Sequence, residues 1–184
     1  MEWIRSKKIR YLQDRNPGVP GIVYKLDPEG KRKLQNVHKL WDAVMNQETV
    51  TDVYSDAVLN GSRYDIDHFI PWSYVTTDEL WNLTPAEKST NTSKSNHLPD
   101  WNAYFEGFLN NQLMLCDSIQ KYEQIRNLFE KCRNNNLNTL WAANLYESQS
   151  HYQFRQLLNE NMRPIYYSAK LQGYRLWNRN TGVF

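Results

Sequence analysis

The chain has 184 residues and a net charge of +2, which suits one medium domain or a small catalytic core with a helical extension. Its 7 Trp, 12 Tyr and 6 Phe supply enough apolar area to exclude an intrinsically disordered chain. Only two cysteines occur, which excludes a disulfide scaffold, and no apolar stretch approaches the roughly 20 residues of a membrane span, so we expect a cytoplasmic protein without a membrane partner.

The charges are unevenly distributed along the chain. Residues 1–39 hold ten Lys and Arg against four Asp and Glu, residues 40–80 hold one against eight, and residues 81–184 hold eleven against eight. An acidic middle between basic flanks is the pattern expected of a cation site inside a surface that binds a polyanion. Charge alone leaves open the simpler alternative that these side chains only solvate a surface.

The N-terminal third is predicted to be mostly helical. We expect a short helix over residues 1–15, a loop over 16–21, and a second helix that starts at Asp27-Pro28, an N-cap followed by proline. Apolar residues at helical spacing extend this second helix to Met45. The β-branched and aromatic run over 49–54 predicts a short strand.

The middle of the chain predicts a small hairpin and a helix. Alternating residues over 64–70 predict a strand that ends at Pro71, and LWNL over 80–83 predicts a second short strand. Residues 84–87, TPAE, have the form of a capping box with proline at the first helical position. The helix that they would open is nearly all Ser, Thr, Asn and Lys, with no apolar stripe, so it needs another reason to exist.

The remainder of the chain is predicted to be helical. We expect long helices from Asp100 to about Arg133 with a break near Asn110-Asn111, then helices over 139–146 and 151–161, with Pro164 as a break. The predicted organisation is a basic, mostly helical flank over residues 1–48, a core over 49–98, and a helical region over 99–184 that packs on the core or mediates assembly.

Four polar residues in the core are candidates for a reaction site. Asp67 and His68 are neighbours at the end of the first predicted strand, where their side chains point to opposite faces. One of them could hold a cation while the other activates a water molecule. Asn82 and Asn91 follow on the second predicted strand and on the polar helix, so three elements could surround one site.

The order DIDHFIPWS, LWNL and KSTNTSKSN followed by LP resembles the HNH endonucleases over about residues 50–100. The resemblance implies a ββα-metal core, a β-hairpin and a helix that grip one metal ion, of the variant without structural zinc. We therefore predict a mainly α fold with a small ββα-metal core and a helical C-terminal extension. It also implies a metal-dependent endonuclease that hydrolyses DNA.

The resemblance assigns a role to each of the four residues. It makes His68 the general base and Asp67 a metal ligand, and Asn82 the residue that fixes the loop and orients the histidine ring. Asn91 stands at the helix position that binds metal, where many relatives carry histidine. Two oxygen ligands favour a hard ion, Mg²⁺ or Mn²⁺.

Substrate contacts are expected from basic residues close to this motif. The candidates are Arg63, Lys88 and Lys94, with further phosphate contacts from the basic N-terminal flank or from the C-terminal helices. Those helices could also join a partner subunit or form a homodimer. The alternatives are a nucleic-acid-binding module that does not cut and a nuclease subunit acting on RNA. Restriction and phage defence are among the settings that use this core.

Overall fold

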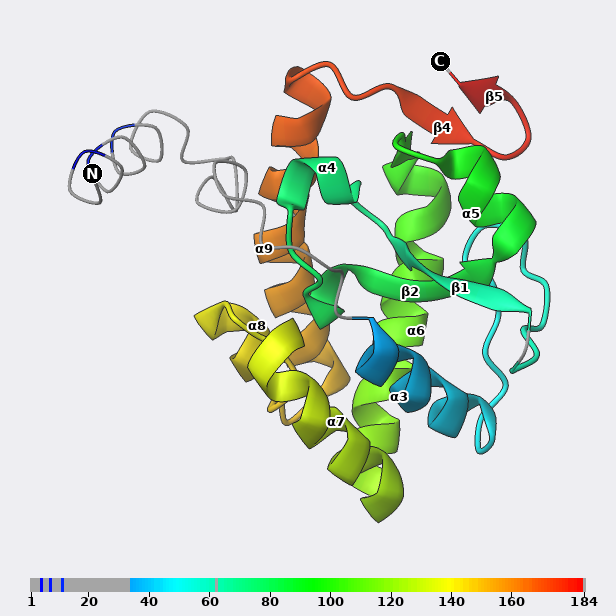
Figure 1. Ribbon diagram of the computed structural model, residues 1–184, viewed down its shortest axis with the longest axis vertical. Helices are drawn as coiled ribbons and strands as arrows, with labels where there is room; N and C mark the ends of the chain where they lie inside the picture. Colours follow the sequence, from blue (N-terminus) through cyan, green and yellow to red (C-terminus); the bar gives the residue numbers. More distant parts are fainter. Residues whose placement is uncertain (1–3, 5–6, 8–10, 12–33, 62, 184) are drawn as a thin grey trace.

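A two-stranded antiparallel hairpin lies at the centre of the computed structural model, which describes residues 4, 7, 11, 34–61 and 63–183 (Figure 1). Strand β1 (Tyr64–His68) pairs with β2 (Leu83–Glu87), with Tyr64 opposite Glu87 and His68 opposite Leu83. Helix α5 (Lys88–Lys94) follows directly and packs on both strands. Since helices make up most of the remaining fold, the predicted mainly α protein with a small ββα core is confirmed.

The boundary between β2 and α5 differs from the sequence prediction. Residues 80–82 form a short 3₁₀ helix, η1 (Leu80–Asn82), and residues 83–87, which include the expected capping box, form β2. Thr84 is buried and pairs with Asp67 across the hairpin instead of capping a helix. Pro85 is tolerated because both strands of a two-stranded sheet are edge strands.

The connection from β1 to β2 contains helix α4 (Trp72–Val75), which Pro71 precedes. Before the hairpin, helix α3 (Gln35–Met45) carries the predicted apolar face. The predicted strand over residues 49–54 is wrong. Thr51 forms only an isolated bridge to Val58, and the side chain of Asp52 accepts the backbone N–H of Tyr54 and so favours a turn. The expected helix over residues 1–15, the loop over 16–21 and the start at Asp27 lie outside the described residues, apart from residues 4, 7 and 11.

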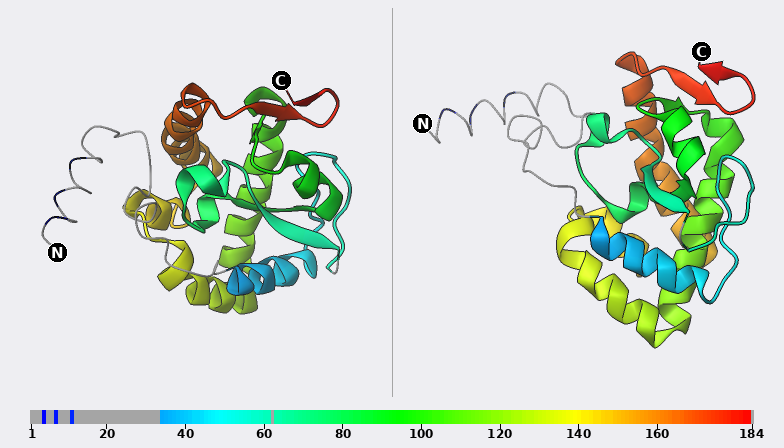
Figure 2. Two further views of the ribbon diagram at one scale, coloured as in Figure 1. Left: turned by 45° about the horizontal axis from the view of Figure 1, so that its top comes forward. Right: turned by 45° about the vertical axis from the view of Figure 1, so that its right-hand side comes forward.

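Helix α6 (Trp101–Lys121) passes behind the hairpin in Figure 1, and Figure 2 shows the same helix from two further directions. It runs without interruption through Asn110-Asn111, where a break was predicted. The side-chain amide of Asn111 donates to the carbonyl of Thr51, and that of Gln112 donates to the carbonyl of Leu83 at 2.7 Å. These polar residues thus anchor the hairpin to the helix. The interruption between helices comes later, between the end of α6 and the start of α7 (Glu123–Asn136).

Two further helices and a small sheet complete the chain. Helix α8 (Leu140–Leu145) agrees with the prediction, whereas α9 (His151–Leu171) continues through Pro164, which was expected to end it. Pro164 is exposed, so the carbonyl of Glu160 that loses its helical partner can bind water. After α9, β4 (Leu176–Asn178) pairs in parallel with β3 (Leu98–Pro99) and antiparallel with β5 (Gly182–Val183).

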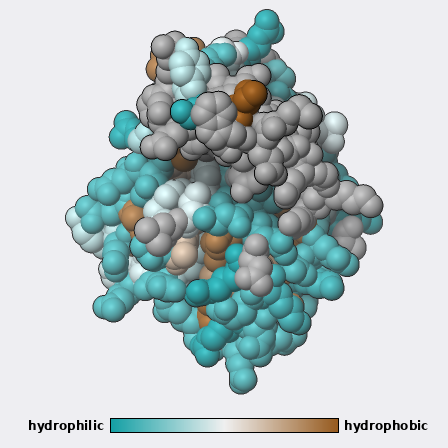
Figure 3. Space-filling model, turned by 60° about the vertical axis from the view of Figure 1, so that its left-hand side comes forward, coloured by the Kyte–Doolittle hydropathy of each residue, from teal (hydrophilic) through white to brown (hydrophobic). Residues whose placement is uncertain are grey.

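One apolar core joins the hairpin to the helices. Phe69, the residue after β1, is fully buried and contacts an aromatic cluster on α6, with 4.6 Å between its ring centre and that of Phe108. Both cysteines are buried in this core, and burial raises the pKa of each thiol to about 11. No described helix has the length and apolar character needed to cross a membrane. The described part of the face in Figure 3 is mostly hydrophilic.

We predict that Phe108→Ala lowers the free energy of unfolding by about 3–5 kcal/mol, because it leaves a cavity between α6 and the hairpin. Urea denaturation measures this loss. Tyr152→Ala is the control, since Tyr152 is 71% exposed on α9 and its removal should change stability by no more than about 0.5 kcal/mol. Similar losses in both variants would contradict a core centred on α6.

Candidate active site

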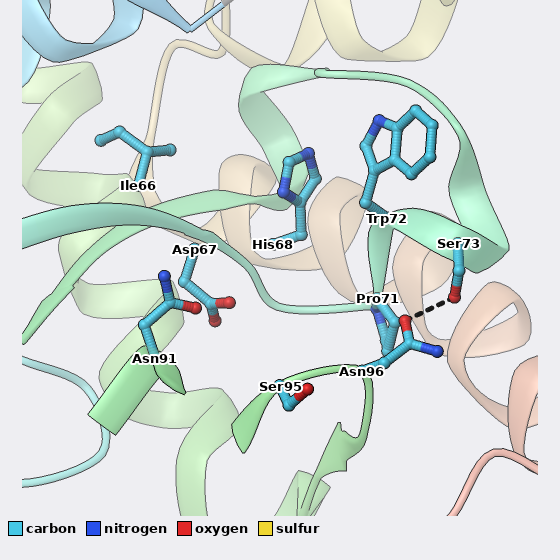
Figure 4. Close-up of a pocket in the computed structure, with 9 residues that line it drawn as sticks. All are labelled: Ile66, Asp67, His68, Pro71, Trp72, Ser73, Asn91, Ser95 and Asn96. Carbon is cyan, nitrogen blue, oxygen red and sulfur yellow. Dashed lines mark hydrogen bonds between the residues drawn. The ribbon is translucent and has the colours of Figure 1, made fainter. Parts of the chain in front are cut away.

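A cavity of about 290 Å³ opens between the end of β1, α4 and the C-terminal end of α5 (Figure 4). Asp67 and His68 both line it, and Figure 4 shows the carboxylate of Asp67 facing Asn91 and the ring of His68 beside Trp72. The structure therefore brings three of the four predicted site residues to one cavity. Its full lining is Ile66, Asp67, His68, Pro71, Trp72, Ser73, Asn91, Ser95 and Asn96.

The carboxylate of Asp67 is buried and is held by two donors from different segments. Its Oδ1 accepts from Lys94 Nζ at 3.0 Å, and its Oδ2 accepts from the hydroxyl of Tyr54 at 2.6 Å. Burial, followed by the charge and the hydrogen bond of Asp67, raises the pKa of Tyr54 well above its usual range, so this phenol remains a donor. Asp67 thus has a fixed orientation before any ligand arrives.

Lys94 is buried and does not line the cavity. Its side chain is 1% exposed, and the ammonium also donates to the backbone carbonyl of His68 at 2.8 Å. Lys94 therefore joins the last turn of α5 to the end of β1. Lys94 was predicted from the sequence to contact substrate. In the structure its ammonium contacts Asp67 and His68, the two residues expected to carry the reaction.

The ring of His68 has a carboxylate partner. Its Nε2 lies 3.0 Å from Oδ1 of Asp78, and both side chains are less than 10% exposed. Because an ionised carboxylate only accepts, Nε2 donates this hydrogen bond. No hydrogen bond joins Nδ1 to any of the described residues, so in the neutral ring this nitrogen can accept a hydrogen bond from a ligand.

Asp78 was not among the predicted site residues. The only signal in the sequence is an acidic pair, Asp78-Glu79, just before LWNL. The pair is anchored to the junction of α7 and α8, where Asn136 donates to the carbonyl of Asp78 at 2.6 Å and the backbone N–H of Asn138 donates to the Glu79 carboxylate. Burial raises the pKa of Glu79, against the opposing effect of hydrogen bonds from Asn138 and Thr139.

Asn82 holds the loop that follows His68. Its side-chain oxygen accepts from the backbone N–H of Ile70 and its amide donates to the carbonyl of Ile70, both at 2.8 Å. Its own carbonyl accepts from the N–H of Phe69. These three bonds set the path of the chain immediately after the histidine, and this geometry agrees with the loop-fixing role that the resemblance implies.

The remaining predicted residues differ in whether they line the cavity. Asn91 lines the cavity, and its side-chain amide forms no hydrogen bond with a described residue, so its oxygen is available to a ligand. Arg63 and Lys88 are exposed near the opposite end of the hairpin and do not line the cavity. Their predicted contacts with substrate remain predictions.

Among the residues that line the cavity, Asp67 and Asn91 are the two predicted to supply oxygen ligands to a metal ion. No cluster of three or more His, Cys, Asp or Glu side chains suited to a metal occurs among the described residues. A carboxylate and an amide oxygen are a donor set that fits Mg²⁺ or Mn²⁺, because Mg²⁺ keeps several water ligands and takes others from substrate phosphate. The residues present therefore fit the ion that the resemblance implies.

Residues 50–100 match the family described as HNH endonuclease. The resemblance drawn from the sequence is thus confirmed over the segment that contains the hairpin, α5 and all four predicted catalytic and metal residues. A nuclease that acts on nucleic acid is the class of protein that this match supports. A search of the curated proteins found none that matches the chain.

We predict that Lys94→Met lowers the free energy of unfolding by about 3–5 kcal/mol, because it leaves the buried charge of Asp67 without its cation. Urea denaturation of purified protein measures the loss. Lys88→Met on the same helix is the control, since Lys88 is exposed and its removal should change stability by no more than about 0.5 kcal/mol.

Combining Lys94→Met with Asp67→Asn should recover part of that loss, because both charges are then absent. Equal stability of the Lys94→Met and Lys88→Met variants would show that the buried ion pair is unimportant for the fold.

Proposed function

We propose that this chain is a metal-dependent endonuclease that hydrolyses phosphodiester bonds of DNA, with His68 as the general base. The observation that carries the proposal is that His68, held by Asp78, lines one cavity together with Asp67 and Asn91, within the segment that matches HNH endonucleases. Mg²⁺ or Mn²⁺ is the proposed cofactor. The core is proposed to span residues 49–98.

Nδ1 of His68 is the proposed acceptor of the proton that the attacking water molecule loses. A water molecule in the cavity donates a hydrogen bond to this nitrogen, and its proton moves to the ring as the water oxygen attacks phosphorus. The imidazolium that forms is stabilised by Asp78, which accepts from Nε2 throughout. Asp78 is therefore a positioning residue that also balances the charge of the protonated base.

Asp67 and Asn91 provide the oxygens that would hold the metal ion. When bound, the ion stabilises the negative charge that develops on the phosphate and on the leaving oxygen. Tyr54 and Lys94 keep the Asp67 carboxylate in one orientation, and Asn82 keeps the loop after His68 in register. The bond between phosphorus and the 3′ oxygen breaks as the water oxygen adds, and the leaving oxygen takes a proton from solvent water. The products expected from the resemblance are a 3′-hydroxyl and a 5′-phosphate.

Two alternatives remain from the sequence. A binding module without activity has no use for a histidine held by a partly buried carboxylate, so the His68–Asp78 pair favours an enzyme. Nuclease activity on RNA uses the same chemistry and differs in substrate recognition. Parallel incubation with plasmid DNA and with a folded RNA separates the two substrates.

We predict that His68→Ala lowers the cleavage rate by about 10²–10⁴-fold while DNA binding is retained, because it removes the base from the chemical step. Asp78→Asn should lower kcat less strongly and leave KM unchanged, since it acts through the histidine. Plasmid cleavage at several DNA concentrations measures both constants.

Asp65→Asn is the control for the change of a carboxylate to an amide, because Asp65 lies on the same strand but outside the cavity lining. A wild-type rate for His68→Ala would overturn the assignment of the base.

We predict that cleavage requires Mg²⁺ or Mn²⁺ and that Asn91→Ala weakens Mn²⁺ binding, measured by calorimetry, because one of two protein oxygens is lost. Asn96→Ala is the control, since Asn96 lines the same cavity but its side-chain oxygen accepts from Ser73. Removing the metal with EDTA should leave the melting temperature nearly unchanged, because no structural metal cluster exists among the described residues. Cleavage that persists in EDTA would contradict the proposed cofactor.

A further inference from the structure

The last part of the chain is basic and has no acidic residue. From Arg163 to Phe184 the sequence contains four cations and no Asp or Glu. All four side chains are exposed: Arg163, Lys170, Arg175 and Arg179. We call these four residues the C-terminal basic face.

None of these four cations forms a salt bridge with a described residue. Some basic residues elsewhere on the helices do pair with carboxylates, as Arg155 does with Glu106 and Arg133 with Glu147. The charge of the C-terminal basic face is therefore not balanced within the described structure, and it remains available to an anionic partner.

Two of the cations lie on one stripe of α9. Arg163, Tyr167 and Lys170 stand at positions i, i+4 and i+7, which share a helix face. The guanidinium of Arg163 lies over the ring of Tyr167, 5.7 Å from its centre. At about 1.5 Å per residue, Arg163 and Lys170 are about 10 Å apart along the axis. That spacing corresponds to about three nucleotide steps of a DNA duplex at 3.4 Å per step.

The stripe leads to the rim of the cavity. Gly173, with a φ of 92°, ends the helix in the left-handed region, and the hydroxyl of Tyr174 then lies 2.8 Å from that of Ser73, which lines the cavity. The backbone carbonyl of Arg175 accepts from Leu98, two residues after the cavity residue Asn96. Figure 4 shows Ser73 and Asn96 bonded to each other at this edge of the cavity.

We infer that the C-terminal basic face binds the phosphodiester backbone of the DNA duplex next to the bond that is cut. The inference rests on the proposed nuclease function. The face is next to the substrate because the proposed function places the scissile phosphate in the cavity. A duplex whose phosphate enters between β1 and α4 continues past Tyr174 onto α9. An acidic protein is a less suitable occupant because nothing would place it beside the cavity.

The test measures DNA affinity in the variant Lys170→Gln/Arg175→Gln. Anisotropy of a short fluorescent duplex is titrated at several salt concentrations in a His68→Ala background with Mg²⁺, so that the duplex stays intact. Loss of two phosphate contacts should raise Kd and reduce the slope of log K against log salt by about 1.8, at about 0.9 per contact. The loss should be equal for unrelated DNA sequences, since phosphate contacts carry no sequence information.

The matched control is Lys39→Gln/Lys131→Gln on α3 and α7. It removes the same charge from exposed positions on two helices that lie at the opposite end of the molecule from β4 (Figure 1), and it should leave the slope unchanged. An unchanged slope in Lys170→Gln/Arg175→Gln, or an equal loss in both variants, overturns the inference.

The two proposals fail in distinguishable ways. If the chain with His68 intact cuts DNA and Lys170→Gln/Arg175→Gln binds normally, the basic face is wrong and the nuclease assignment stands. If that chain cuts no DNA while the salt slope still depends on Lys170 and Arg175, the face binds DNA and the nuclease assignment is wrong.

Discussion

The buried carboxylate of Asp67 is the constraint around which the core is organised. A charge removed from water needs close partners, and the chain supplies them from two sides, Tyr54 before the hairpin and Lys94 after it. This need explains the polar helix α5, which has no apolar stripe to bury. Its buried side chains are Thr90 and Lys94, one turn apart, so the helix is held by a charge pair where other helices are held by apolar contacts.

Residues that are close in sequence were the predictable part of the site. Asp67 and His68 stand on one strand whose alternation is visible in the sequence, and Asn82 and Asn91 follow in a recognisable order. The partners that hold them, Tyr54 and Asp78, could not be predicted, because nothing in their local sequence shows which distant side chain they meet.

Local signals also failed where tertiary contacts decided the outcome. Residues 84–87 have the residue types of a capping box, but Thr84 and Pro85 pair with β1 and belong to a strand. Asn110-Asn111 suggested a break because Asn is a weak helix former, yet Asn111 uses its amide to hold the loop before the hairpin. Pro164 lies inside α9 because its exposed side leaves the freed carbonyl to water.

The anchoring of Asp78 and Glu79 to the α7–α8 junction has a consequence for how the protein is made. Asn136 and Asn138 lie 58 and 59 residues after their partners, so these contacts close long loops and cannot form until α7 has been synthesised. The ββα segment leaves the ribosome earlier, and at that stage the segment that carries the partner of His68 has no anchor. The anchor of the segment that carries the hydrogen-bond partner of His68 is therefore completed only after α7 has been synthesised.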